Sequence, residues 1–99
     1  MAGFVQLIEW KTSRYDDVKK LNEEWRERFP AMGPSRVLVA SDRDKNGSFV
    51  TIVEFDSYEA AMENSADPAT SEFASRMQEL CDGPPTFHNL DVRDLEVRR

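Results

Sequence analysis

The sequence has very few of the residues from which metal and nucleophilic sites are built. It contains one cysteine, Cys81, and one histidine, His88. A single cysteine excludes an internal disulfide and is typical of a reducing cytoplasm. No partner motif surrounds Cys81, which indicates a small buried residue or a helix-end residue, not a nucleophile. The sequence also lacks a Ser-His-Asp order, a glycine-rich phosphate loop, zinc-ligand spacing and a dinucleotide fingerprint, so we expect no metal site.

Positive charge and long apolar runs are also in short supply. Thirteen basic residues against nineteen acidic ones give a net charge of −6, which disfavours nucleic acid or an anionic membrane as a partner. No apolar run approaches the roughly 18 residues of a membrane-spanning helix. The N-terminal residues 1–11 lack the basic start and the long apolar region of a signal peptide. We therefore expect one cytoplasmic domain over residues 1–99.

The most informative stretch is residues 48–62, which reads as a buried strand followed by a capped helix. Residues 49–55 are mostly apolar and do not alternate cleanly, which indicates burial on both faces. Asp56 is the expected N-cap, with Glu59 three residues later as in a capping box. Asp67 followed by Pro68 predicts a second cap, which interrupts the helix and begins a segment over residues 68–81.

The remaining strands and helices can be predicted in the same way, and together they define the fold class. A strand is expected over residues 3–11, and a helix follows Ser13, with an apolar stripe of Val18, Leu21, Trp25 and Phe29 before Pro30 ends it. A second strand over 36–42 and the Asn46-Gly47 turn lead into the strand already described, and a last strand covers 86–92. This β-α-β-β-α-β order predicts an α+β, ferredoxin-like protomer: a four-stranded antiparallel sheet with both helices on one face.

The strands are apolar in both phases. Phe4, Ile8 and Trp10 occupy one phase of the first strand, while Val5 and Leu7 occupy the other. Helices cover only one face, and monomers rarely expose an apolar patch of several hundred Å². We therefore expect a homodimer that packs sheet against sheet.

The segment Glu54–Ala60 reads Glu-aromatic-x-Ser-x-Glu-Ala and precedes a helix broken near a proline. With this topology, the chain resembles the dimeric α+β-barrel superfamily over residues 3–92, and in particular the antibiotic-biosynthesis-monooxygenase-like proteins and their uncharacterised branches. The resemblance implies a homodimeric barrel with a cavity beside each sheet. It does not fix the function, because members range from enzymes to proteins with no known activity.

The resemblance also singles out Asn64. Members similar to quinol monooxygenases often carry a histidine nine residues after the aromatic that ends the strand, and that position here is Asn64. Asparagine keeps hydrogen-bonding capacity but cannot act as a base. It is either a polar residue where the helix breaks or a hydrogen bonder that lines a cavity. Haem-degrading relatives bind iron through a histidine on the second helical segment, and residues 68–81 contain none, so we expect no haem.

Other candidates each carry two interpretations. His88 is either a structural histidine, on one strand face with Leu90 and Val92, or an acid or base in a cavity. Trp10 either lines the cavity between the two sheets or packs in the core or the dimer interface, and Phe55 is expected to line a ligand pocket. Glu54 either pairs with a basic group or acts as a catalytic carboxylate with a raised pKa.

The loop over residues 42–47 imitates the start of a calcium site. Its twelfth position is Val53, where a glutamate is needed, so it predicts a plain hairpin.

Two functions follow from these residues. The first is a dimer that holds a small apolar or aromatic ligand between sheet and helices, without catalysis. The second is a monooxygenase that needs no cofactor and acts on a quinol or polyphenol, because an electron-rich substrate can react with oxygen itself. Gln6, Trp10, Asn64 and His88 would then serve as orienting donors, stacking wall and possible base. Neither function calls for a cofactor.

Overall fold

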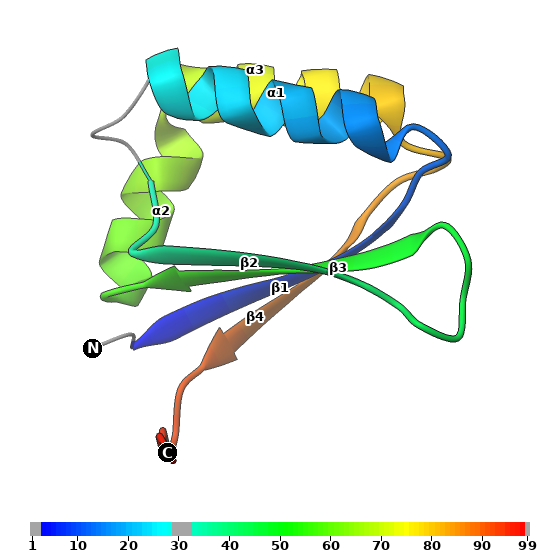
Figure 1. The fold of residues 1–99 in the computed structure, drawn as a ribbon. Coiled ribbons are helices and arrows are strands. Elements are labelled where there is room, and N and C mark those ends of the chain that lie inside the picture. The colour runs from blue at the N-terminus through cyan, green and yellow to red at the C-terminus, as the bar shows by residue number, and fades with distance from the viewer. Residues whose placement is uncertain (1–2, 29–32, 99) are drawn as a thin grey trace.

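The computed structural model describes residues 3–28 and 33–98 (Figure 1). The predicted end of the first helix at Phe29 and Pro30 lies outside the described residues. The elements run in the order β1 (Phe4–Lys11), α1 (Tyr15–Arg28), β2 (Arg36–Ser41), β3 (Ser48–Phe55), α2 (Tyr58–Ala66), α3 (Pro68–Leu80) and β4 (Thr86–Asp91). Within these residues, no helix combines the length and apolar character that crossing a bilayer requires.

The four strands form one antiparallel sheet in the order β2-β3-β1-β4. In the register between β1 and β3, Phe4 lies opposite Phe55 and Trp10 lies opposite Phe49. The β2–β3 hairpin turns at Gly47, whose φ of +81° is a conformation that glycine adopts without strain. The predicted ferredoxin-like α+β fold is confirmed.

The helices cover one face of this sheet. Helices α1 and α3 run side by side across it, and α2 stands at one end, where the chain bends sharply into α3 (Figure 1). Val18, Leu21 and Trp25 form the buried stripe of α1. The Trp25 ring lies 5.6 Å from the ring of Phe73 on α3, so aromatic packing joins the two long helices.

Side-chain parity gives the sheet two different faces. On β1, Phe4, Gln6, Ile8 and Trp10 point toward the helices; we call this the helix-facing side. Val5 and Leu7 point the other way, toward the outer face. Phe4, Phe55 and Ala61 form a buried cluster at the α2 end of the helix-facing side, with Val53 and Met62 packed against it.

Two caps delimit the broken helix. Ser57, not Asp56, is the N-cap of α2: its backbone is extended, and its hydroxyl oxygen accepts a 3.1 Å hydrogen bond from the Ala60 amide. The prediction of Asp56 was wrong by one residue, because aspartate and serine cap comparably well and the sequence offers both in succession. Asp67 caps α3, accepting from the Ala69 amide at 2.9 Å with Pro68 at the start of the helix, as predicted.

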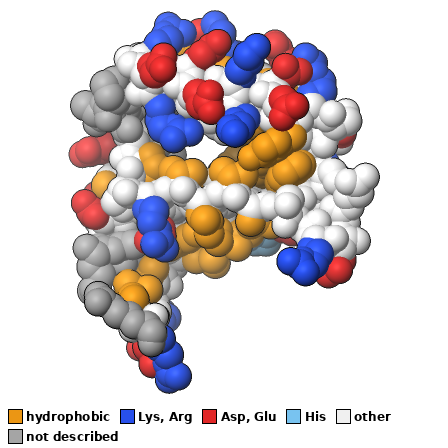
Figure 2. Space-filling model, in the orientation of Figure 1, with side chains coloured by type: hydrophobic (Ala, Val, Ile, Leu, Met, Phe, Trp, Pro, Cys, Tyr) orange, Lys and Arg blue, Asp and Glu red, His pale blue; other side chains and the backbone are white. Residues whose placement is uncertain are grey.

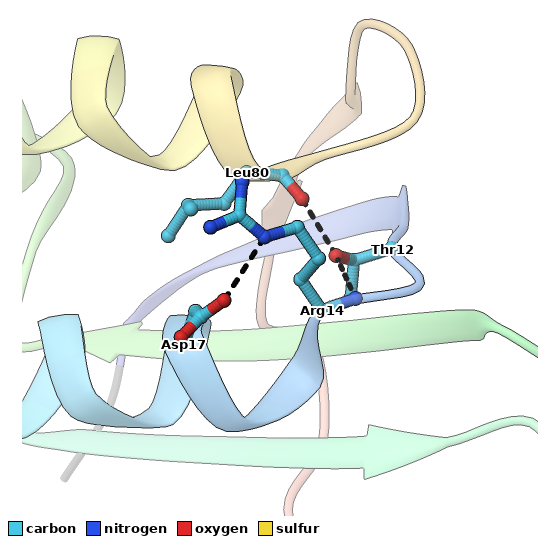
Figure 3. A network of polar contacts seen from close by, with 4 residues as sticks. All are labelled: Thr12, Arg14, Asp17 and Leu80. Atoms are coloured by element: carbon cyan, nitrogen blue, oxygen red, sulfur yellow. Dashed lines mark hydrogen bonds and ion pairs between the residues drawn. The ribbon is translucent and has the colours of Figure 1, made fainter.

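At the opposite end of the sheet, Thr12 ties three segments together. Its buried hydroxyl donates to the Leu80 carbonyl at 2.6 Å and accepts from the Arg14 amide at 2.9 Å (Figure 3). Its own amide donates to the Gly47 carbonyl at 3.0 Å. The start of α1, the end of α3 and the hairpin are therefore fixed to the end of β1.

Candidate functional site

A buried polar group lies where α2 bends into α3. Asn64 is three residues after the fully buried Ala61, so both lie on the inward side of α2. The Asn64 Oδ1 atom is buried and accepts no hydrogen bond within the described residues. Gly33, just before β2, faces it: a Cβ placed on Gly33 would stand 3.7 Å from this oxygen. Asn64 therefore presents a buried acceptor between α2 and the connection that enters β2.

Thr70, in the first turn of α3, carries a second group of this kind. The spacing of Thr70, Phe73 and Met77 puts them on one side of the helix, and all three are half-buried. The Thr70 Oγ1 atom is buried and has no hydrogen-bond partner within the same described residues. Leaving such a hydroxyl unpaired costs about 1–3 kcal/mol. Sequence reasoning missed Thr70: the helical spacing could have placed it on the apolar stripe, but it could not have shown that its hydroxyl lacks a partner.

The helix-facing side of the sheet adds polar groups below this corner. Gln6 lies next to the Phe4 end of β1 and donates to Asn89 Oδ1 on β4 at 3.2 Å. Thr51, at the middle of β3, accepts a 2.8 Å hydrogen bond from the Trp10 indole. Gln6, Trp10 and Phe55 therefore share the face on which a ligand was expected, but they spread along its whole length.

Packing distinguishes these three residues further. The Trp10 ring stacks on Phe49 at 4.7 Å, and Phe49 stacks on Tyr15 at 4.9 Å, so Trp10 belongs to an aromatic stack at the end away from α2. Phe55 is 3% exposed within the cluster at the α2 end. Of the three, Gln6 has the polar, half-buried position that suits a contact with a ligand near Asn64.

His88 lies on the outer face. It pairs in register with Leu7, and its Nε2 atom lies 2.8 Å from Glu9 Oε2. A ligand on the helix-facing side would be separated from His88 by the sheet itself. Glu54 also points to the outer face, where it pairs with Arg36 as one of its two interpretations predicted.

Both edges of the helix-facing side are incompletely covered. Val37 on β2 is 52% exposed and Phe87 on β4 is 54% exposed, although both point toward the helix layer. Figure 2 shows hydrophobic side chains in a recess between the helix layer and the front edge of the sheet. The helix-facing side of the sheet is therefore partly open to solvent along its two edges.

Two more open hollows lie at the other end of the sheet. Both include Lys11 and Asp82 in their walls, and they border the hairpin and the residues after α3. Asn64 and Thr70 contribute to neither. Across the described ranges, no group of three or more His, Cys, Asp or Glu side chains is placed to hold a metal ion.

Solved structures with this fold are known, whereas no sequence-family profile and no curated protein matches the chain. SnoaB, a cofactor-independent oxygenase from Streptomyces nogalater, superposes with a TM-score of 0.79 at 15% identity, over 96% of this chain and 97% of its own. A SnoaB variant with one asparagine replaced by alanine superposes with a TM-score of 0.76 at 18% identity, over 95% of this chain and 97% of its own.

A candidate antibiotic biosynthesis monooxygenase from Deinococcus radiodurans gives a TM-score of 0.76 at 13% identity, over 97% of this chain and 98% of its own. These structures match nearly the whole length of the chain at low identity. The chain therefore has the fold of the antibiotic-biosynthesis-monooxygenase-like proteins, and the predicted resemblance to this superfamily is confirmed at the level of fold.

Proposed function

We propose that this protein is a cofactor-independent oxygenase acting on a quinol or polyphenol bound between sheet and helices, at the α2 end. The buried Oδ1 atom of Asn64 carries the proposal, because a substrate hydroxyl would supply the hydrogen-bond donor that residues 3–28 and 33–98 do not. The fold shared with SnoaB, described as a cofactor-independent oxygenase, supports the reaction class.

In this reaction the substrate provides the electrons. At a ring carbon that carries two hydrogens in the keto form, one atom of O₂ enters as a carbonyl oxygen, and the other leaves as water with those two hydrogens. Asn64 would orient the substrate and stabilise its polar edge, but an amide cannot remove a proton. One of the two hydrogens would first leave as a proton to solvent through the open edge of the recess, and solvent would return a proton when the second oxygen atom leaves as water.

A second candidate is the binding of an aromatic ligand without turnover. Asn64, Thr70 and Gln6 are all non-titratable, so none of these three side chains can act as a base. That composition suits recognition as well as catalysis. The two functions share the ligand class and differ in whether oxygen is consumed.

We further propose that two copies assemble through their outer faces. Leu38 on β2 is 51% exposed and Leu90 on β4 is 45% exposed on this face, around half-buried Val5 and Leu7. Hydrophobic side chains appear below the strand layer as well as above it (Figure 2). A second copy would cover this apolar centre. The single cysteine supports a cytoplasmic setting.

Oxygen uptake with a panel of quinols tests the enzyme proposal. We expect uptake above the rate of quinol autoxidation with the wild type, and a loss of about tenfold or more in kcat/KM for Asn64→Ala, because a buried orienting hydrogen bond is removed.

Asn46→Ala is the matched control. It removes another asparagine amide, at an exposed position of the β2–β3 hairpin at the opposite end of the sheet, and should retain most of the activity. Quinol binding without uptake would favour the second candidate, and neither binding nor uptake would contradict both.

A further inference from the structure

We propose that Thr70 is a second ligand contact, so that the ligand is an aromatic with at least two oxygen substituents. One substituent donates to Asn64 Oδ1, and the other accepts from the Thr70 hydroxyl. The inference rests on the proposed function, and it goes beyond it by assigning a second residue to the contact with the second oxygen of the ligand.

The first argument is position. Thr70, Phe73 and Met77 form the inward stripe of α3, and valine would fill the Thr70 position with nearly the same shape. A hydroxyl there gains nothing for the fold, because its oxygen is buried and unpartnered within the described residues. Groups that weaken a fold without a packing benefit are found where a ligand supplies the missing bond.

The second argument is the geometry of the bend. The Asp67 amide donates to the Asn64 carbonyl at 3.2 Å, and the Thr70 amide donates to the Asp67 carbonyl at 3.0 Å. Pro68 stiffens the same segment. Asn64 and Thr70 are therefore the two ends of one short, hydrogen-bonded connection, which fixes their spacing. Two polar groups held in this way select a ligand with more than one oxygen.

Binding under argon, where quinols do not oxidise, tests the pairing of Thr70 with one ligand oxygen. The probes are naphthohydroquinone and naphthol, its analogue with one hydroxyl fewer, measured by titration calorimetry. We expect Thr70→Val to weaken naphthohydroquinone binding by about tenfold, which is the equivalent of about 1.4 kcal/mol. Naphthol binding should change much less, and Thr70→Ser should bind both ligands as the wild type does.

Urea unfolding of the free protein distinguishes a ligand contact from a structural role. If the Thr70 hydroxyl were structural, Thr70→Val would lower the free energy of unfolding. Thr70→Val should be at least as stable as the wild type, because it removes an unpartnered hydroxyl. If Thr70→Val were less stable than the wild type and bound the ligand equally well, the inference would be overturned. The Thr70 hydroxyl would then be assigned a structural hydrogen bond to a buried water.

The remaining outcomes separate the two proposals. If Asn64→Ala loses naphthohydroquinone and Thr70→Val does not, this inference fails and the proposed function stands. If Thr70→Val weakens both ligands equally, the hydroxyl does not read the second oxygen, and the inference also fails. If the wild type binds neither probe, both proposals fail.

Discussion

Two threonines in this chain illustrate the difference between a polar group used by the fold and one that the fold leaves unused. Thr12 is 3% exposed, and its hydroxyl makes two hydrogen bonds that join β1, α1 and α3. Thr70 has a buried hydroxyl with no such partner within the described residues. The same side chain is thus structural at one end of the molecule and, in the role proposed for Thr70, a ligand contact at the other.

Cys81 gives a prediction of pH dependence at the scale of one residue. Burial, and to a smaller extent the neighbouring Asp82 carboxylate, raises the pKa of the Cys81 thiol. We expect the midpoint of its alkylation by iodoacetamide to lie at a higher pH than that of a cysteine in an unstructured peptide. The rate measured against pH, for the folded protein and for the peptide, checks this. A midpoint at or below that of the peptide would contradict the assigned environment.

The same shift has a consequence for stability. The folded state holds the Cys81 proton to a higher pH than the unfolded state does. Stability is therefore complete below the ordinary pKa of a thiol and declines as the pH rises through the raised pKa. Cys81→Ala should remove that part of the alkaline decline.

At the scale of the element, the break between α2 and α3 depends on Asp67. Its carboxylate caps α3, and its own amide closes the last turn of α2. We expect Asp67→Ala to lower the free energy of unfolding in urea by about 1 kcal/mol, the usual effect of losing a capping side chain. Asp67→Asn keeps the acceptor oxygen and should be close to the wild type. Equal destabilisation by both variants would show that charge, not capping, matters here.

Most elements of this protein could be predicted from local pattern. The strands are apolar runs bounded by turn residues, and the Asp67-Pro68 pair marks the start of α3 correctly. The choice between Asp56 and Ser57 could not be made, because it depends on which residue adopts the extended cap conformation. The predicted N-cap of α2 was therefore one residue before the observed one.

The candidate site was harder to predict from the sequence than the secondary structure was. Alternation fixes which residues of a strand share a face, and His88 and Leu90 do share one. It does not say which of the two faces meets the helices, since that depends on the pairing of β4 with β1. Thr70 stayed hidden for a different reason: whether its hydroxyl is satisfied depends on the three-dimensional surroundings, which no spacing reveals.

At the scale of the whole molecule, the two faces of the sheet should respond differently to charge. Leu38 and Val37 are neighbours on β2 with nearly equal exposure, 51% and 52%, but they point to opposite faces. We expect Leu38→Asp to convert a dimer into monomers in sedimentation velocity at micromolar concentration, because a carboxylate would be buried at the proposed interface.

Val37→Asp is the control for this prediction. It introduces the same charge on the same strand, but toward the recess on the helix-facing side, and should leave the dimer intact. A monomeric wild type, or equal dissociation of both variants, would count against assembly through the outer face.

The strand order has a consequence for how the chain is made. β1 is synthesised before the other described strands, yet its second hydrogen-bonding neighbour is β4, at Thr86–Asp91, more than seventy residues later. Until that segment emerges from the ribosome, the backbone groups along one side of the opening strand stay unpaired and open to other nascent chains. Chains truncated before β4 should therefore aggregate instead of remaining in solution.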